Sequence, residues 1–250
     1  ALPILAATAR ELGLDVTLVE AGDRLCARAL PPNMSSWLKE LHGRHGVRIM
    51  LNTAVSSACK QADGSFEVRL SPAGELGETL VVDLVIAGIG MIANDELASA
   101  AGLACTEGVV VDASCRTSDP DIVAAGDCTS HTMARYGSRI RLESVSSAGE
   151  QAKIAAATIC GKHSAIAALP WFWSDQYDLK LQIAGLNTGY DEVLLSGDPS
   201  RDRDFSCFYF REGELIAADC VNRPRDFMSS KRAISQQLRV DRSDLLTGSI

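Results

Sequence analysis

Hydrophobic and polar positions in the first twenty residues predict a helix followed directly by a strand. In "LPILAATARELGL" (2–14) small and apolar residues recur every three or four positions, which is typical of a helix, and Gly13 ends the run. "DVTLVE" (15–20) is a β-branched stretch that predicts a strand ending at Glu20. A helix leading into a strand at the very start is typical of a βαβ unit that lacks its first strand. We therefore expect an N-terminally truncated piece of a longer protein.

The region up to residue 90 predicts a second helix, a group of short strands and one fully apolar strand. A helix is expected over 33–46, with Asn33 or Ser35 as its N-cap. "LVIAGIG" (84–90) is apolar throughout, which predicts a buried strand that closes on a Gly-x-Gly. Short runs between them predict a β-meander inserted into an α/β domain, with strands in "VRIML" (47–51), "AVSSACK" (54–60), "SFEVRL" (65–70) and "TLVVD" (79–83).

The stretch that follows predicts further α/β structure. "NDELASAAG" (94–102) predicts a short helix capped by Asn94, and "GVVVD" (108–112) predicts a strand. In "TSDPDIVAAGDC" (117–128) an apolar run predicts a buried strand that stops at Gly126 and Asp127.

The longest helix is expected over "SVSSAGEQAKIAAATICG" (144–161), after a loop of roughly fifteen residues that follows Asp127. Ser147 and Glu150 have the spacing of a capping box, and Gly161 supplies the stop.

The character of the chain changes near residues 162–170. Aromatic residues cluster in "PWFWSDQY" (170–177), and alternating runs then predict an α+β module of about eighty residues. Its strands are expected in "LKLQIAGL" (179–186), "DEVLLSG" (191–197), "DFSCFYF" (204–210) and "ELIAADCV" (214–221), and its helix in "RDFMSSKRAISQQL" (225–238).

Composition limits the classes of function. The 250 residues are 46% hydrophobic and 22% charged, which predicts a globular chain of two domains rather than a disordered one. A net charge of −8 argues against a general nucleic-acid or membrane-surface binder. No run of eighteen apolar residues predicts a membrane span. The eight scattered cysteines contain no C-x-x-C pair, so we expect reduced cytoplasmic thiols and no zinc ribbon or metal site, with His42 and His45 as a solvated pair at a helix end.

Two features suggest a dinucleotide site, and each has a structural alternative. Glu20, at the carboxyl end of the strand, is where a dinucleotide fold binds the adenosine ribose 2′-OH and repels a 2′-phosphate, although strands also end in solvated glutamates. Arg24 and Arg28 lie within reach of a pyrophosphate or adenine, or are surface arginines. The Gly-x-Gly at 88–90 permits a planar ligand to approach the backbone, or marks a tight turn.

Asp127 and the helix beyond it suggest a flavin site. An unpaired carboxylate at the end of a buried strand is costly unless it has a partner. Asp127 either marks a turn or accepts hydrogen bonds from the hydroxyl groups of a polyol such as a ribityl chain. The N-terminus of the capped helix carries free N–H groups and a partial positive charge, which suit an anion such as a reduced flavin. Trp171, Phe172 and Trp173 fill a core or, for a tryptophan, lie beside the ligand.

Several of these stretches, in this order, resemble a known family. "TSDPDIVAAGDC", "RLESVSSAGEQAKIAA", "PWFWSDQYDLKLQIAGL" and "CVNRPRDF", together with "DLVIAGIGMIANDELASAAGL", are similar to flavoprotein ferredoxin reductases of bacterial oxygenase systems, which include the biphenyl-type dioxygenase reductases and the putidaredoxin reductase family. The chain lacks the N-terminal FAD half and the NAD glycine loop of that family, and has Pro3 or Ile4 where the family commonly places a Glu.

The resemblance implies a partial glutathione-reductase-like α/β fold with an FAD domain, an NAD domain and a C-terminal α+β reductase domain. The expected boundaries are 1–88 for the NAD domain, 89–165 for the C-terminal part of the FAD domain and 166–250 for the reductase domain. It also implies the cofactor contacts. For FAD these are Gly126, Asp127, Glu143, Ser144, Val145, Ala148 and Trp173, and for NAD they are Glu20, Arg28, Gly88, Ile89 and Gly90.

The implied activity is electron transfer from NADH through FAD to a [2Fe–2S] ferredoxin that feeds an aromatic-ring dioxygenase or a P450. The alternative is a protein like apoptosis-inducing factor, in which NADH binding and protein contacts matter more than turnover. Because ferredoxins are usually acidic, a local basic face is expected for docking, although a solvated set of charges is the simpler interpretation. The candidates are Arg135, Arg139, Arg141, Arg223, Arg225, Lys231 and Arg232.

Overall fold

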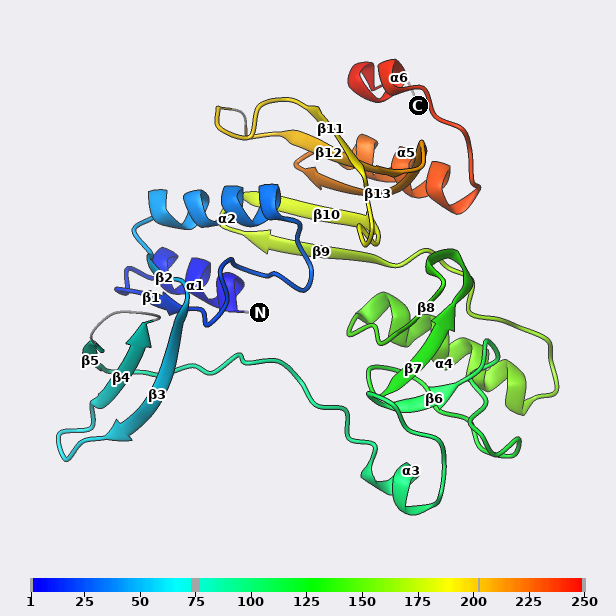
Figure 1. Ribbon diagram of the computed structural model, residues 1–250, viewed down its shortest axis with the longest axis horizontal. Coiled ribbons are helices and arrows are strands. Elements are labelled where there is room, and N and C mark those ends of the chain that lie inside the picture. Colours follow the sequence, from blue (N-terminus) through cyan, green and yellow to red (C-terminus); the bar gives the residue numbers. More distant parts are fainter. Residues whose placement is uncertain (1, 73–76, 202, 249–250) are drawn as a thin grey trace. The chain divides into compact units, whose positions relative to one another are not determined.

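The computed structural model describes residues 2–72, 77–201 and 203–248 and divides into two compact units (Figure 1). The first unit comprises residues 1–89, 174–181 and 197–205. The second comprises residues 90–173, 182–196 and 206–250.

The first unit is built on a βαβ arrangement. Strand β1 (Thr17–Val19) and strand β2 (Arg48–Met50) pair in parallel and are joined through helix α2 (Pro32–Arg44), while helix α1 (Leu2–Glu11) precedes them. The core is made of small residues of α1 and larger ones of the strand and α2, since these are the apolar positions at helical and strand spacing. It includes Ala6, Ala7, Leu18, Met34, Leu38 and Leu41. The two predicted helices and both strands are therefore confirmed.

The start of helix α2 differs from the prediction. Pro31 occupies the N-cap position and no side chain caps the helix, because Pro32 already fixes the first turn. The hydroxyl of Ser35 instead donates to the backbone oxygen of Leu25 at 2.7 Å and is buried. Asn33 also lies inside the helix, so both predicted N-caps are wrong.

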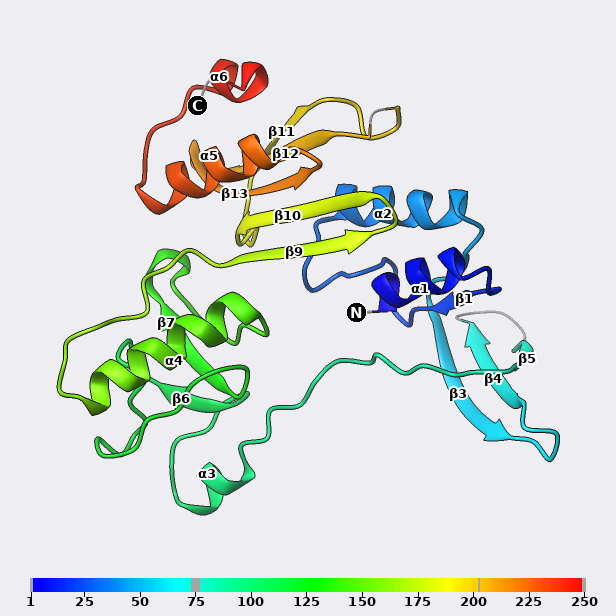
Figure 2. The same ribbon diagram turned by 180° about the vertical axis from the view of Figure 1, so that it is seen from behind.

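Three of the four strands predicted as a β-meander form one in the first unit, whereas the predicted strand 47–51 is β2, which pairs in parallel with β1. Strands β3 (Thr53–Lys60), β4 (Phe66–Pro72) and β5 (Thr79–Val82) form an antiparallel sheet in that order (Figure 2). Val68 and Leu70 of the central strand are buried, as expected for one apolar face.

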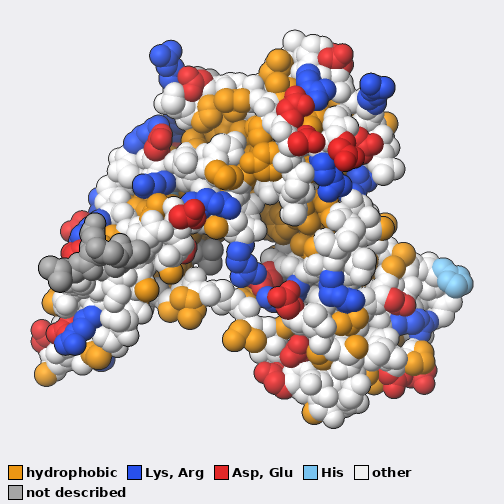
Figure 3. All heavy atoms as spheres, in the orientation of Figure 1, with side chains coloured by type: hydrophobic (Ala, Val, Ile, Leu, Met, Phe, Trp, Pro, Cys, Tyr) orange, Lys and Arg blue, Asp and Glu red, His pale blue; other side chains and the backbone are white. Residues whose placement is uncertain are grey.

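The apolar segment 84–90 is not a strand. Its residues have no regular secondary structure, and Leu84 is 68% and Ile89 97% exposed. Figure 3 shows hydrophobic side chains at the surface along this segment. A fully apolar strand needs neighbouring strands to bind its backbone and cover its faces, and no described strand pairs with residues 84–90. The prediction of a buried strand is wrong for this chain for that reason.

The second unit opens with a small mixed sheet. Helix α3 (Glu96–Ala100) has Asp95, and not the predicted Asn94, at its N-cap. Strand β6 (Val109–Val111) pairs in parallel with β7 (Thr129–Met133), which pairs antiparallel with β8 (Ser138–Ile140) across a short 3₁₀ turn (Ala134–Tyr136). A β-hairpin therefore occupies most of the segment that the sequence analysis predicted as a loop.

The run 121–127 is an irregular segment after a turn, rather than a buried strand. Only Val123 makes a β-bridge, to Arg116, and Ile122 is 40% exposed. The chain reverses its direction in a turn at Asp119 and Pro120, in which the Ile122 N–H donates to the Asp119 oxygen. Asp127 therefore precedes strand β7 instead of ending a strand.

Helix α4 (Val145–Ile159) is the longest helix, as predicted, but its N-cap lies three residues before the expected cap Ser147. Ser144 is the N-cap, and its Oγ accepts from the Ser147 N–H at 3.3 Å. Glu150 is not part of a capping box, because its carboxylate accepts from the N–H groups of Ala167 and Ala168. Gly161, with φ of +68°, lies just beyond the helix end, as predicted.

The C-terminal module is a five-stranded sheet with helix α5 (Pro224–Ser235) packed on strand β13. Helix α6 (Arg242–Thr247) follows α5 and was not predicted. Aromatic and small residues from β12, β13 and both helices form its core, including Phe208, Phe210, Ala218, Cys220, Phe227 and Leu245. The strands stand in the order β11 (Glu192–Ser196), β12 (Phe205–Arg211), β13 (Glu214–Val221), β10 (Leu179–Gly185) and β9 (Trp171–Gln176).

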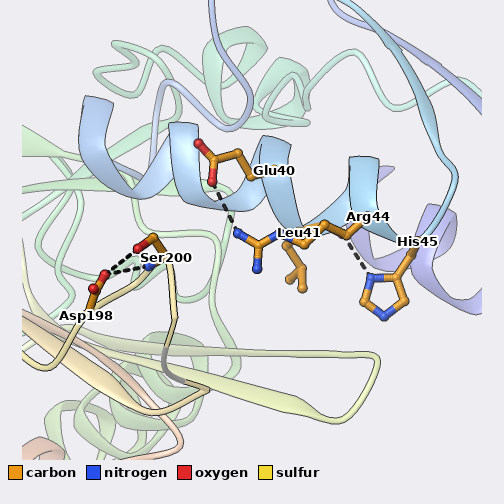
Figure 4. Close-up of polar contacts among 6 residues, drawn as sticks. All are labelled: Glu40, Leu41, Arg44, His45, Asp198 and Ser200. Carbon is orange, nitrogen blue, oxygen red and sulfur yellow. Dashed lines mark hydrogen bonds and ion pairs between the residues drawn. The ribbon is translucent and has the colours of Figure 1, made fainter.

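His42 is a buried core residue of the first unit and not a solvated one. Its Nε2 lies 2.8 Å from Gln176 Oε1, and its Nδ1 lies 2.9 Å from the Tyr177 hydroxyl. Gln176 Nε2 donates to Ser174 Oγ, so the Gln176 oxygen faces His42 and the ring carries its proton on Nε2. The ring of His45 stacks on that of Tyr177 with 3.7 Å between centroids. Figure 4 shows the contact of His45 Nδ1 with the Leu41 oxygen, at 2.9 Å.

Replacing His42 by Ala should lower the free energy of unfolding by about 2–4 kcal/mol, because it leaves a cavity and two unpaired polar groups. Burial lowers the pKa of His42 below 6.5, so the unfolded chain binds a proton first as the pH falls. The neutral ring of His42 makes its full contribution to the free energy of unfolding above about pH 6.5, and this contribution decreases below that pH. Chemical denaturation at pH 5–8 measures both effects, with exposed His163→Ala as the control. An equal loss in both variants would contradict the assigned role.

All eight cysteines are free thiols, and three of them, Cys115, Cys207 and Cys220, are buried as small core residues. In the described ranges, no helix has the length and apolar character needed to cross a membrane.

Candidate functional site

A buried glutamine holds the Gly126–Asp127 turn against helix α4. The Gly126 N–H donates to Gln151 Oε1 at 2.8 Å, and the Thr129 hydroxyl donates to the same oxygen at 2.6 Å. Gln151 Nε2 donates to Ser147 Oγ, also on α4, at 3.1 Å. The φ of +93° at Gly126 is a conformation that favours glycine. These contacts place Asp127 beside the first two turns of α4.

The side chains at this place face outward. Asp127 is exposed, and Val145, the first residue of α4, is 74% exposed. The Ser144 hydroxyl satisfies only the Ser147 N–H, so the first N–H groups of the helix remain directed at the surface. The turn that carries this carboxylate is held on the helix whose N-terminus offers N–H groups, and these two features suit a ligand with hydroxyl groups and a negatively charged edge.

The tryptophans of β9 connect to the same helix start. The Ser146 hydroxyl donates to the backbone oxygen of Trp171 at 3.0 Å. Trp171 packs on the C-terminal core and lies under Lys231, whose Nζ is 4.4 Å from the ring centroid. Trp173 stacks on Trp171 with 5.3 Å between centroids and is 45% exposed. Trp171 therefore packs on a core, and Trp173 keeps part of its ring exposed.

The remaining residues predicted to contact FAD lie at the same helix start. Glu143 precedes the N-cap and pairs with Arg141 at 2.8 Å, while Ala148 is half-buried in the first turn. A cavity of about 50 Å³ lies under this turn, lined by Met133, Leu142, Ser146, Ser147, Glu150 and Trp171 among others. It has room for a few water molecules and not for an isoalloxazine ring. A flavin would therefore lie over the exposed residues.

The residues predicted to contact NAD are less closely grouped. Glu20 directly follows β1, and its Oε1 accepts from the Gly22 N–H at 2.9 Å, so it shapes the turn at the strand end. Arg24 donates to Ser35 Oγ, Ala27 O and Leu30 O, which makes it a structural residue of the loop. Arg28 is exposed in the turn before α2.

The two glycines of Gly88-Ile89-Gly90 have different surroundings. A Cβ at Gly88 would lie 2.7 Å from Leu2 Cγ, so glycine allows the segment to pack on α1. Gly90 has a φ of +103° and belongs to the second unit. Ile89 points into solvent, and Glu20 lies elsewhere in the first unit, at the end of β1.

The basic residues predicted for docking differ in exposure and in the partners of their side chains. Arg139, Arg225 and Arg232 are exposed. Arg135 donates to the Ser235 oxygen and Arg223 to Ser196 Oγ, while Lys231 lies over Trp171. Arg141 is turned inward, with only 13% of its side chain exposed.

The sequence analysis missed Gln151 as a site residue. A signal was present, because Ser147, Gln151, Ile154 and Thr158 share the buried face of α4, and a buried amide requires polar partners. No group of three potential metal ligands occurs within the part of the chain that the structure describes.

The parallel pair β1–β2 is followed by Glu20, and the Gly126–Asp127 turn is held on the capped helix α4. This combination is typical of dinucleotide-binding proteins. Sequence profiles agree: residues 4–152 match the pyridine nucleotide-disulphide oxidoreductases, and residues 171–249 match the reductase C-terminal domain. The chain belongs to the pyridine nucleotide-disulphide oxidoreductase family. The predicted fold class is thereby confirmed.

Individual relatives narrow the comparison. The chain is 40% identical over 96% of its length to the 5,5′-dehydrodivanillate O-demethylase ferredoxin reductase subunit of a Sphingobium species, and 41% identical over 95% to putidaredoxin reductase of Pseudomonas putida. It spans 58% and 56% of those proteins. The crystal structure of the covalent putidaredoxin reductase–putidaredoxin complex matches with a TM-score of 0.89 at 41% identity, covering 96% of this chain and 57% of that one. The resemblance to ferredoxin reductases is confirmed.

Proposed function

We propose that the full-length protein is an NADH-dependent flavoprotein that passes electrons through FAD to a [2Fe–2S] ferredoxin, which feeds an aromatic-ring dioxygenase or a P450. The relatives named as ferredoxin reductases support the reaction class. A relative whose structure contains putidaredoxin supports the partner. When bound, FAD accepts electrons from NADH as a pair and releases them singly.

The observation that carries this proposal is the position of Asp127 beside the start of α4. The Gly126 N–H bonded to Gln151 fixes the turn, and the carboxylate of Asp127 is left exposed to accept hydrogen bonds from ribityl hydroxyls. The N-terminus of α4 at Ser144 and Val145 offers N–H groups to the pyrimidine edge, and Trp173 offers a face to the ring. Glu143 and Ala148 complete the proposed FAD contacts.

For the nucleotide, we propose Glu20 and Arg28 at the adenosine end and Gly88, Ile89 and Gly90 beside the nicotinamide. The Glu20 carboxylate would accept from the ribose 2′-OH and repel a 2′-phosphate, which favours NADH over NADPH. With these assignments, the proposed domain boundaries are 1–88 for the NAD domain, 89–165 for the C-terminal part of the FAD domain and 166–250 for the reductase domain. The free thiols support a cytoplasmic location.

The proposal is tested on the full-length protein by its absorption spectrum and by anaerobic titration with NADH. We expect a flavin spectrum that NADH bleaches more readily than NADPH. Reduction of cytochrome c should then depend on added [2Fe–2S] ferredoxin. A protein that holds no flavin, or that NADH does not reduce, would contradict the proposal.

Replacing Asp127 by Ala should weaken FAD retention about 10- to 100-fold, because hydrogen bonds to a charged acceptor contribute about 1.5–3 kcal/mol. The ratio of flavin to protein after dilution and gel filtration measures the effect. Asp121→Ala, another exposed aspartate of the same turn region, is the control. Equal flavin content in both variants and the wild type would remove Asp127 from the site.

A further inference from the structure

We propose that Arg141 is a positioning residue of the cofactor site, and not a ferredoxin-docking residue, because it ties together three segments that the proposed function assigns to the cofactors. Its Nη2 donates to the Met91 oxygen at 3.2 Å and pairs with Glu143 Oε1 at 2.8 Å. Its Nη1 contacts the Asp127 oxygen at 3.4 Å. All four residues belong to the second unit.

The burial of Arg141 indicates a structural use of its charge. Only 13% of the side chain is exposed, and a guanidinium withdrawn from water is stable only where acceptors replace the lost water. Two backbone oxygens and one carboxylate supply that replacement. Because these donors already have acceptors, an acidic partner protein would have to displace existing bonds to reach them.

A neighbouring glycine makes room for the aliphatic part of the side chain. Gly108 has a φ of +122°, and a Cβ there would lie 3.4 Å from Arg141 Cδ and 2.6 Å from the Cys128 oxygen. The close approach of the Gly108 backbone to Cys128, next to Asp127, therefore coincides with the path of the arginine. This packing is independent of the hydrogen bonds and shows that the site is shaped around the side chain.

The three held segments explain what Arg141 would position. Met91 follows Gly90 of the proposed nicotinamide strip, Asp127 carries the proposed ribityl carboxylate, and Glu143 precedes the N-cap of α4. Two of the contacts are to backbone oxygens, so they fix where the chain lies rather than which side chain it carries. One planar fork reaches all three acceptors, whereas a lysine ammonium acts as a single point and cannot span them.

The test uses the full-length flavoprotein and separates reduction by NADH from the transfer to ferredoxin. In single-turnover experiments without ferredoxin, Arg141→Lys and Arg141→Gln should slow flavin reduction by NADH about 10- to 100-fold, as expected for misplaced reactants. The KM for ferredoxin and its dependence on ionic strength should stay at the wild-type values. Arg139→Gln, exposed two residues earlier, should leave flavin reduction unchanged.

A second variant guards against a simple folding defect. Glu143→Gln removes the charge that pairs with Arg141, so it should slow flavin reduction less strongly than Arg141→Lys does. In the double variant, the combined effect should be smaller than the sum of the two single effects. Wild-type flavin reduction in Arg141→Lys, or a change confined to the KM for ferredoxin, would overturn the inference. A wild-type protein without flavin or NADH reactivity would instead refute the proposed function, so the two failures are distinguishable.

Discussion

Replacing Gly185 by Ala should lower the free energy of unfolding by about 3 kcal/mol or more, the largest effect expected of any single methyl group in the described chain. Gly185 ends strand β10 with a φ of +75°, and a Cβ there would lie 2.2 Å from the backbone oxygen of Ile216 in β13. A strained backbone costs about 1–2 kcal/mol and forced overpacking about 1–3 kcal/mol. Since the blocking atom belongs to the backbone of a central strand, the sheet itself must shift.

Gly213 provides the matched control for this prediction. It has a similar φ of +82° in the same unit, but no atom lies within 4 Å of its added Cβ. Gly213→Ala should therefore cost only the backbone strain, about 1 kcal/mol. Chemical denaturation of the two variants separates the steric effect from the conformational one. An equal loss of unfolding free energy in the two variants would contradict the prediction, because it would mean that the sheet accommodates the added methyl group at Gly185 without a steric cost.

The same substitution should reach the proposed flavin site. The Gly185 N–H donates to the Pro170 oxygen at 2.8 Å, and Pro170 immediately precedes Trp171 on β9. A shift of Gly185 away from β13 loosens that bond and moves the start of the strand that carries Trp173. Flavin fluorescence or the visible absorption maximum should therefore change in Gly185→Ala and not in Gly213→Ala.

Structure that depends on neighbouring residues was predictable from the sequence. Helices α1, α2 and α4 follow their apolar spacing, and the meander β3–β5 follows its alternation, because periodicity within a segment determines which face can be buried. The Gly126–Asp127 turn and the start of α4 were located for the same reason, since turns and helix starts are marked by local residue types, although the strand expected to end at Asp127 is absent.

Structure that depends on distant partners was not predictable. The run 84–90 has the composition of a buried strand, yet its outcome depends on strands that must pair with it, and composition does not show whether they are present. The caps of α2 and α4 were misplaced by up to four residues, because Pro32 and Ser144 fix the starts earlier than the stronger-looking motifs. Arg141 was predicted as a surface residue because one arginine in a loop gives no sign of its backbone acceptors.

Replacing Asp219 by Asn should remove a pH dependence of stability between about pH 4 and 7. Asp219 is completely buried in strand β13, where Oδ2 accepts from the Tyr209 hydroxyl at 2.7 Å and Oδ1 has no hydrogen-bond partner among the described residues. Burial raises the pKa of Asp219 to about 7. The folded protein therefore keeps a proton that the unfolded chain has already released above its ordinary pKa of 3.8.

The sign follows from this difference in bound protons. The protonated side chain of Asp219 makes its full contribution to the free energy of unfolding below about pH 4. As the pH rises, this contribution decreases by up to about 1.4 kcal/mol per pH unit, and it levels off above about pH 7. The total change is on the order of 4 kcal/mol. Asparagine has the same shape and no charge at any pH, so the stability difference between the wild type and Asp219→Asn should shrink or change sign as the pH rises from 4 to 7.

Urea denaturation of both proteins across this range measures the difference, with exposed Asp121→Asn as the control for a lost charge. Parallel stability curves for the wild type and Asp219→Asn would show that the carboxylate ionises normally in its buried position. Tyr209→Phe provides an independent check, because the Tyr209 hydrogen bond lowers the pKa of Asp219. Without that hydroxyl the pKa should rise further, and the pH at which the stability of the protein levels off should move upward with it.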